Sequence, residues 1–215
     1  MDKHQLIVRK TARYVTLGPL NEHTRRIWFV LHGYGQLAQY FIPKFDVLDD
    51  GQTHVVAPEG LSRFYLNGVG GSSKVGATWM TREDRLHEID DYLSYLNTLY
   101  QVLIGDGGNH VTQIGLLGFS QGAATACRWL AGGKLRFDKL VLWAGNLPDC
   151  PYWERMKEVE SIFVYGKQDP LISSHVLEEQ MEKVARLGCT ISVKAFEGKH
   201  EVRREVVAKV CGNCP

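Results

Sequence analysis

Gly118-Phe119-Ser120-Gln121-Gly122 lies near the middle of this sequence and decides how the rest of it is interpreted. An apolar run, Val111 to Leu117, precedes this pentapeptide, and a helix-like segment, residues 123–130, follows it. A serine between two glycines at a strand-to-helix turn is the pattern of a nucleophile elbow, in which a sharp turn exposes the serine hydroxyl. The alternative is a glycine-rich turn in which Ser120 only caps the next helix. Partners elsewhere in the chain must decide between these two interpretations.

Strand-like and helix-like segments alternate on both sides of this turn. We expect strands at residues 26–31, 53–57, 111–117, 140–144, 161–165 and 190–196, and helices at 37–50, 82–104, 123–130, 174–187 and 201–210. Most of the strand segments are continuously apolar, as in a parallel sheet that is covered on both faces. The pattern predicts a single α/β domain over residues 1–215, with a mostly parallel central sheet and helices on both of its faces.

Three segments fit this alternation less well. Gln5–Val8 and Arg13–Leu17 are predicted to form an edge hairpin ahead of the first parallel strand. The helix expected at 37–50 contains Pro43, which weakens the prediction unless the helix begins or kinks there. Residues 59–81 are rich in glycine and aromatic residues and show no periodicity. A long loop without regular structure is uncommon unless it is functional, so a functional loop is expected there.

Charge and hydropathy exclude several classes of partner. The chain has 25 basic and 24 acidic residues, a formal net charge of +1, so nothing indicates a nucleic-acid partner. The first ten residues lack the apolar core of a signal peptide, and no apolar run is long enough to span a bilayer. We therefore expect a cytoplasmic protein with no stable membrane association, which is a monomer or a homodimer.

The five cysteines are scattered and odd in number, so no disulfide framework is expected. Cys127 and Cys189 lie in apolar surroundings and are interpreted as core thiols. Cys211 and Cys214 have a redox-like spacing, but they stand at the frayed end of the chain and are interpreted as incidental. No histidine has metal-ligand spacing and no cofactor motif is present, so neither a metal nor a cofactor is expected.

Reactive side chains follow several of the predicted strands, whose carboxyl ends meet at one edge of a parallel sheet. Ser120, Asp169 and His200 occur in the order serine, acid, histidine, which is that of α/β-hydrolases. A serine hydroxyl needs an imidazole to take its proton, and that imidazole needs a carboxylate to hold its tautomer. These residues are therefore the candidate catalytic residues.

Each partner of Ser120 has a competitor. Asp169 could be a simple turn former before Pro170, and Asp149, in a proline-flanked loop, is the rival acid. His175 follows the acid closely, but it stands at a helix start and would reach the serine poorly. His32, at a strand end, is expected to brace the loop that follows it rather than to transfer a proton.

Attack on a carbonyl creates an oxyanion, which preorganised backbone N–H groups stabilise. The amide of Gln121, directly after the serine, is one candidate donor. The second is expected from the loop after the strand at 26–31, with Tyr34 as the best candidate. The alternative for His32-Gly33-Tyr34-Gly35 is an ordinary flexible turn.

Four segments together resemble one family. Leu31–Gly35, Gly118–Gly122, Gly166–Pro170 and Gly198–His200 are similar to the phospholipase/carboxylesterase family, small lidless α/β-hydrolases that include acyl-protein thioesterases and bacterial carboxylesterases. The resemblance extends over almost the whole chain. It implies an α/β-hydrolase fold, a triad of Ser120, Asp169 and His200, and an oxyanion hole from the amides of Tyr34 and Gln121. The chain departs from the family pattern at Tyr34 and Gln36 and at Trp143, where family members usually carry other residues.

The substrate is the least determined part of the prediction. Only residues 146–160 lie where larger lipases insert a lid domain, so no lid is expected. Phe64, Tyr65, Trp79 and Trp143 are predicted to line an apolar pocket for short- to medium-chain acyl esters, although aromatic residues could equally pack the loop onto the core. The function expected is that of a serine carboxylesterase acting on a small-molecule ester. The alternatives are acyl-protein thioesterase or lysophospholipase activity on the same triad, or a non-catalytic binding protein.

Overall fold

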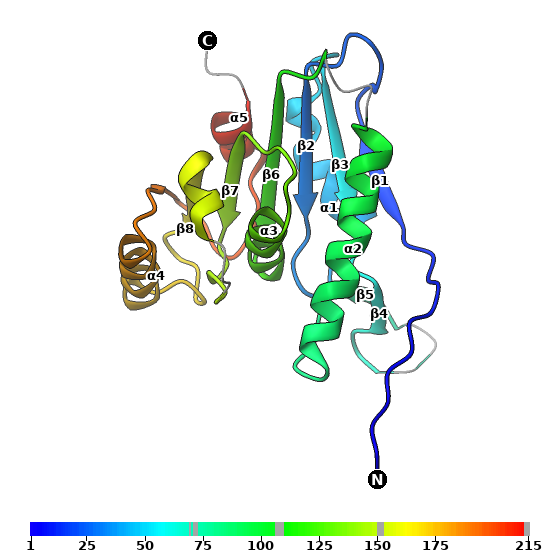
Figure 1. Ribbon diagram of the computed structural model, residues 1–215. Coiled ribbons are helices and arrows are strands. Elements are labelled where there is room, and N and C mark those ends of the chain that lie inside the picture. Colours follow the sequence, from blue (N-terminus) through cyan, green and yellow to red (C-terminus); the bar gives the residue numbers. More distant parts are fainter. Residues whose placement is uncertain (69, 71–72, 106–109, 150–152, 213–215) are drawn as a thin grey trace.

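Seven strands form the central sheet of the computed structural model, which describes all residues except 69, 71–72, 106–109, 150–152 and 213–215 (Figure 1). They are β1 (Tyr14–Leu17), β2 (Arg26–Leu31), β3 (Thr53–Pro58), β6 (Gln113–Phe119), β7 (Lys139–Trp143), β8 (Glu160–Gly166) and β9 (Ser192–Phe196). Their order across the sheet is β1-β3-β2-β6-β7-β8-β9, and every pair except β1 with β3 is parallel. The predicted mostly parallel sheet is confirmed, and the strand that leads into Ser120 lies in its middle.

Helices cover both faces of this sheet. The helical segments are α1 (Ala38–Phe41), the 3₁₀ helix η1 (Ile42–Leu48), α2 (Arg85–Leu103), α3 (Gln121–Gly132), the 3₁₀ helix η3 (Trp153–Glu158), α4 (Ser174–Arg186) and α5 (Arg204–Cys211). In Figure 1, α2 and α3 lie in front of the sheet, and α1 and α5 lie behind it. Both faces of the central strands are therefore buried, which explains why their sequences are continuously apolar rather than alternating.

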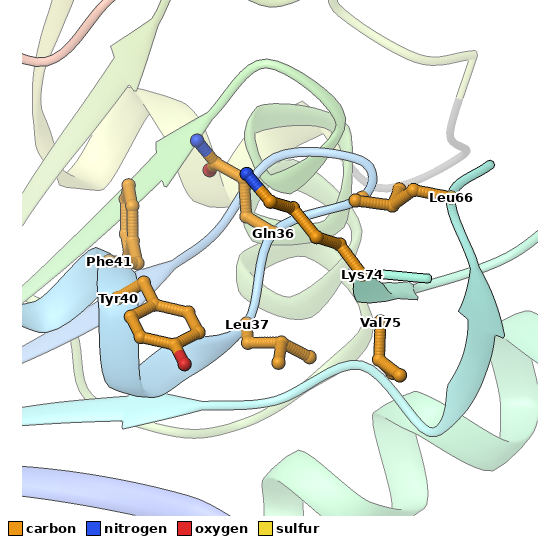
Figure 2. Close-up of a pocket in the computed structure, with 8 residues that line it drawn as sticks. Gln36, Leu37, Tyr40, Phe41, Leu66, Lys74 and Val75 are labelled. Atoms are coloured by element: carbon orange, nitrogen blue, oxygen red, sulfur yellow. The ribbon is translucent and has the colours of Figure 1, made fainter. Parts of the chain in front are cut away.

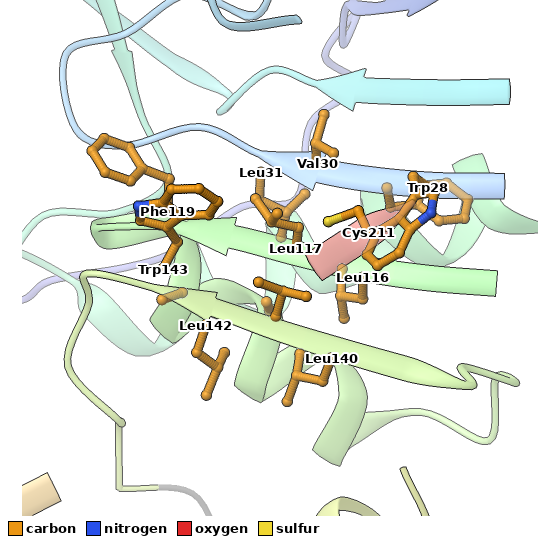
Figure 3. Close-up of a cluster of buried hydrophobic side chains, with 14 of the residues drawn as sticks. Trp28, Val30, Leu31, Leu116, Leu117, Phe119, Leu140, Leu142, Trp143 and Cys211 are labelled. Atoms are coloured by element: carbon orange, nitrogen blue, oxygen red, sulfur yellow. The ribbon is translucent and has the colours of Figure 1, made fainter. Parts of the chain in front are cut away.

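The core is built on the strands at the centre of the sheet. Residues Ile27 to Leu31 of β2 are all fully buried, and the side chains of β6 and β7 pack beside them (Figure 3). Burying one such aliphatic or aromatic side chain contributes about 1.5–3 kcal/mol. Cys127 and Cys189 are buried as predicted. Cys211 is buried as well, because α5 carries it into the core beside β2 and β6, so it is not part of a frayed end. Cys214 lies outside the described residues.

The predicted N-terminal hairpin is wrong. Residues 1–13 contain no strand, and β1 pairs instead with β3, with Leu17 opposite Val55. Pairing with β3 half-buries Leu17, whereas Leu6, Ile7 and Val8 are exposed. Those three side chains gain no burial that could offset the cost of ordering a strand.

Two further predictions need correction. The helix expected at 37–50 is one turn of α-helix followed by η1, with Pro43 at the start of the 3₁₀ segment, where its missing N–H is not needed. Residues 59–81 are not without regular structure, because β4 (Ser62–Tyr65) and β5 (Val75–Thr78) form a two-stranded antiparallel sheet. A bridge between Gln36 and Ala77 joins this hairpin to the loop after β2.

No helix within the described residues is long and apolar enough to cross a membrane.

Candidate active site

The turn between β6 and α3 has the geometry of a nucleophile elbow. Ser120 has φ 53° and ψ −117°, a backbone conformation that costs a non-glycine residue about 1–3 kcal/mol. A Cβ atom on Gly118 would lie 2.2 Å from the carbonyl oxygen of Gly122, and one on Gly122 would lie 2.3 Å from that of Leu31. Only glycine fits at either position. Ser120 occupies the N-cap position of α3, but its side chain makes no capping hydrogen bond, so the helix-cap interpretation is wrong.

Asp169 and His200 meet at the same edge of the sheet. Asp169 follows β8 and His200 follows β9, and the Nδ1 atom of the imidazole lies 2.7 Å from Oδ2 of the carboxylate. The carboxylate is completely buried, and its other oxygen accepts a hydrogen bond from the N–H of Leu171 at 2.9 Å. The imidazole packs on the ring of Phe119, with 4.8 Å between ring centroids, directly before Ser120 in the chain. The structure thus brings all three predicted residues to one edge.

The competing residues lie elsewhere. The carboxylate of Asp149 is fully exposed and bonds to Lys183. The side chain of His175 is 79% exposed on α4, beside Glu179. Neither residue is held in a buried hydrogen-bond network of the kind that holds Asp169 and His200.

His32 braces the loop after β2, as predicted. Its Nε2 accepts a hydrogen bond from the N–H of Gly60 at 2.9 Å, and its Nδ1 lies 2.8 Å from the carbonyl oxygen of Gly33. Nε2 therefore carries no proton, and Nδ1–H is the donor to Gly33. Burial lowers the pKa of His32, which keeps the ring neutral, although the Gly33 carbonyl and the nearby Glu59 act in the opposite direction.

Glu59 is a buried carboxylate beneath the same loop. It accepts hydrogen bonds from Arg13, from Arg63 at 2.8 Å and from the N–H of Ala38 at 3.1 Å. Burial alone would raise the pKa of Glu59, but these hydrogen bonds outweigh it and the pKa lies below its ordinary value. The network joins the end of β3 to the start of α1, so the loop between β2 and α1 is held at both sides.

Stability should fall in mild acid because of the buried histidines. Burial lowers the pKa of both His32 and His54 below the ordinary value of about 6.5. As the pH falls through about 6.5, the unfolded chain binds protons that the folded chain rejects. The stabilisation is complete above this pH and is lost as the pH falls toward the folded-state pKa values. We expect the urea midpoint of unfolding to fall between pH 7.5 and pH 5.5.

The double variant His32→Asn/His54→Asn should lose most of this pH dependence, although it will be less stable overall. His23→Asn, which changes an exposed histidine, is the matched control and should keep it. An unchanged slope of midpoint against pH in the double variant would contradict the assignment.

The loop after β2 leaves the backbone amide of Tyr34 without an internal acceptor. The N–H of Gly33 donates to Oε1 of Gln36 at 2.9 Å, and the N–H of Gly35 donates to the carbonyl oxygen of Ala77 at 2.8 Å. Between them, the N–H of Tyr34 has no hydrogen-bond partner among the described residues. The Tyr34 ring points away and packs on Phe64, with 5.1 Å between centroids. An amide that is not used by an internal acceptor is one requirement of the predicted oxyanion donor.

The side chain of Gln121 holds a neighbouring segment in place. Its Oε1 accepts from the N–H of Trp79 at 3.1 Å, and its Nε2 donates to the carbonyl oxygen of Met80 at 2.8 Å. The same side-chain amide bonds to the hydroxyl of Thr78 at 3.0 Å. These bonds fasten the end of β5 to the first turn of α3, where backbone N–H groups have no intrahelical partner. Sequence reasoning missed this side-chain role, because nothing local in the sequence predicts that β5 ends beside Gln121.

The predicted pocket residues are mostly elsewhere. Trp79 is 1% exposed, stacks on His32 and donates its indole N–H to the His32 carbonyl oxygen at 2.8 Å. Trp143 is fully buried and donates its indole N–H to the carbonyl oxygen of Glu201 at 3.0 Å. Both indoles thus fill the core, where their polar atoms find partners. Phe64 is half-buried against Tyr34, and Tyr65 is exposed.

A cavity of about 300 Å³ opens directly at Ser120. Its lining comes from the start of α3, the segment after β7 and the segment after Asp169: Ser120, Gln121, Ala124, Ala144, Gly145, Asn146, Leu171 and Ile172. Sequence reasoning missed most of these residues. Ala144 and Gly145 directly follow Trp143, where the sequence departs from the family pattern, and Leu171 stands two residues after the candidate acid. Within the described residues, no group of three or more histidine, cysteine or acidic side chains could hold a metal ion.

Comparison with known families assigns the chain. The model of the FSH1 serine hydrolase family matches residues 22–205, a range that includes the elbow, Asp169 and His200. The chain belongs to the FSH1 serine hydrolases. It is therefore an enzyme, and the expected likeness to phospholipase/carboxylesterase α/β-hydrolases is confirmed. No curated protein sequence matched this FSH1 family member.

Solved structures show the same fold at low sequence identity. Esterase PE8 is 18% identical, with a TM-score of 0.66 over 93% of this FSH1 chain and 99% of that chain. The acyl-protein thioesterase 2 of Zea mays is 20% identical, with a TM-score of 0.69 over 94% and 96%. The carboxylesterase of Bacillus cereus is 16% identical, with a TM-score of 0.62 over 92% and 91%. The lidless α/β-hydrolase fold is confirmed.

Proposed function

We propose that this serine hydrolase is a carboxylesterase that hydrolyses short- to medium-chain acyl esters through an acyl-enzyme intermediate. The observation that carries the proposal is the 2.7 Å hydrogen bond between His200 and the buried Asp169, beside the strained Ser120. The buried carboxylate of Asp169 is shielded from solvent and bonds to the imidazole of His200. It therefore orients that ring next to the nucleophile elbow.

In acylation, Oγ of Ser120 attacks the ester carbonyl carbon while Nε2 of His200 takes the hydroxyl proton. Asp169 accepts the Nδ1–H of the ring and stabilises the imidazolium that forms. The carbonyl oxygen becomes an oxyanion, which the N–H groups of Tyr34 and Gln121 stabilise. Each such donor is worth about 3 kcal/mol. The C–O bond to the leaving alcohol then breaks, and His200 returns the proton to the alcohol oxygen.

In deacylation, a water molecule attacks the acyl-serine carbonyl and His200 takes its proton. The second tetrahedral intermediate uses the same two N–H groups. Its collapse releases the carboxylic acid and restores the Ser120 hydroxyl, with the proton returned from His200. No cofactor or metal enters either half-reaction.

The same residues could cleave a thioester, and this is the second candidate function. The observation in its favour is the similarity to the fold of the Zea mays acyl-protein thioesterase. Lysophospholipid hydrolysis is the other variant of the same chemistry. A non-catalytic binding role is disfavoured, because a silent hydrolase would be expected to lack a member of the triad.

We propose a single-domain monomer or homodimer in the cytoplasm, which acts on a small-molecule ester. The one continuous sheet, ordered β1-β3-β2-β6-β7-β8-β9, supports the single domain.

The test is hydrolysis of p-nitrophenyl esters from acetate to octanoate, beside octanoyl thioester of a small thiol. We expect Ser120-dependent hydrolysis of the esters, because the cavity at Ser120 is open to the surface. A higher kcat/KM for the thioester would favour the second candidate function. Acid quenching during turnover should trap an acyl group on the peptide that contains Ser120, read by mass spectrometry. Hydrolysis at the buffer rate, or an acyl group on another residue, would refute the proposal.

A further inference from the structure

A second and larger cavity, about 720 Å³, lies between the loop after β2 and the β4–β5 hairpin (Figure 2). We call it the hairpin groove. Its lining consists of Gly35, Gln36, Leu37, Tyr40, Phe41, Leu66, Lys74 and Val75. The groove is more than twice as large as the cavity at Ser120.

One end of the hairpin groove reaches the reaction centre. A Cβ atom on Gly33 would lie 3.2 Å from Cβ of Ser120 and 3.3 Å from Oε1 of Gln36. The Gln36 side chain, which lines the groove, is therefore a near neighbour of the nucleophile. Gly35 and Gln36 also directly follow Tyr34, whose N–H is the proposed oxyanion donor. A substrate bound to this amide has the groove on one side and the smaller cavity on the other.

The walls of the groove are mainly apolar. Leu66 is 41% exposed and Val75 38% exposed, and both face Leu37 and Phe41 across the groove (Figure 2). Apolar side chains that line an open hollow of this size mark a binding site for an apolar group. An extended acyl chain is the part of an ester that fits such walls.

One cation interrupts the apolar lining. The side chain of Lys74 extends across the groove toward the side-chain amide of Gln36 (Figure 2). Lys74 forms no ion pair among the described residues, whereas Arg63, the other cation of the hairpin, is held by Glu59 at 2.8 Å. A partner that carries an anion on an otherwise apolar chain matches this lining. Its anion pairs with the ammonium group, and its chain packs on the apolar walls.

We propose that the hairpin groove binds the acyl chain of the substrate and that Lys74 pairs with a carboxylate carried on that chain. The substrate class is then the half-esters of dicarboxylic acids. The smaller cavity, bordered by Ala124, Leu171 and Ile172, receives the leaving alcohol. The inference rests on the proposed function, since it requires Ser120 to attack the ester.

The first experiment assigns the two cavities. Val75→Trp narrows the hairpin groove, and Leu171→Trp narrows the cavity at Ser120. Both residues are exposed, so the folded protein should tolerate the larger side chain. One ester series varies the acyl chain on p-nitrophenol, and a second varies the alcohol on acetate. We expect Val75→Trp to lower kcat/KM about ten-fold for octanoate but not for acetate. Leu171→Trp should lower kcat/KM for bulky alcohols, p-nitrophenol included, by the same factor at every acyl length. The reverse pattern would overturn the assignment.

The second experiment tests the cation. The substrates are the p-nitrophenyl half-ester of adipic acid and the neutral p-nitrophenyl hexanoate, whose acyl chains have equal length. In Lys74→Met, the ratio of their kcat/KM values should fall about five-fold, as expected for one partly exposed ion pair. Lys74→Arg should retain the ratio. Lys134→Met, which removes an exposed lysine elsewhere, is the control. An unchanged ratio in Lys74→Met would overturn the role of the cation.

The acetate rate separates the two possible failures. If the wild type shows no Ser120-dependent hydrolysis of p-nitrophenyl acetate, the proposed function fails and this inference fails with it. If acetate is hydrolysed and every groove variant behaves as the wild type, only the inference about the hairpin groove fails.

Discussion

Ser120→Ala is expected to lower kcat for p-nitrophenyl butyrate by about 10⁵- to 10⁶-fold, the loss seen when a triad serine is removed. Alanine cannot form the acyl-enzyme, and the remaining N–H donors stabilise only the weak direct attack of water. The backbone conformation at φ 53° costs alanine about as much free energy as it costs serine, so the variant should fold. The rate is measured at saturating ester, and unfolding is followed by circular dichroism.

The control for this variant is Ser94→Ala, which removes a hydroxyl from the exposed side of α2. Its kcat should match the wild type within two-fold. A Ser120→Ala enzyme that keeps more than one tenth of the wild-type rate, with its unfolding unchanged, would show that another nucleophile operates.

Asp169→Asn should lower kcat by about 10⁴-fold with little change in KM. The asparagine amide can donate to Nδ1 of His200, which would leave the proton on Nε2 and the wrong tautomer facing Ser120. The buried position offers no water or second carboxylate to replace the lost oxygen, because the Asp169 side chain is completely buried. The measurement is the full pH–rate profile, which should be depressed at every pH.

Asp149→Asn is the matched control, because it makes the same chemical change in the rival acid. The carboxylate of Asp149 is fully exposed and bonds to Lys183, so its replacement should change kcat less than two-fold. If Asp149→Asn were the crippling change and Asp169→Asn were silent, the proposed triad would be wrong.

The elbow could be predicted from sequence because its requirements are local. The pattern is a serine after an apolar strand, with a glycine two residues away on each side. These glycines are needed because the backbone is crowded between Gly118, Gly122 and Leu31. The parallel sheet was equally predictable, since strands buried on both faces must be continuously apolar. The meeting of Asp169 and His200 followed from that sheet, because the carboxyl ends of its strands share one edge.

The pocket could not be predicted in the same way. Trp79 and Trp143 are large aromatic residues near the predicted site, so a pocket was expected to include them. Whether an indole lines a pocket or fills the core depends on contacts with residues that are distant in sequence. The His32 carbonyl receives one indole N–H and the Glu201 carbonyl receives the other. The β4–β5 hairpin was missed for a related reason. Its strands are only four residues each, too short for a periodic pattern.

The hydrogen bonds of the Gln121 side chain to the end of β5 determine which part of the β4–β5 hairpin can change without affecting the reactive groups. The side-chain amide holds Thr78, Trp79 and Met80 against the start of α3, so this end of the hairpin and the backbone around Ser120 form one rigid unit. Leu66 and Lys74 lie beyond that anchored end. Replacements there alter the shape and charge of the groove without displacing the reactive groups. In the proposed assignment, substrate preference can therefore change through the hairpin while the reactive groups keep their positions.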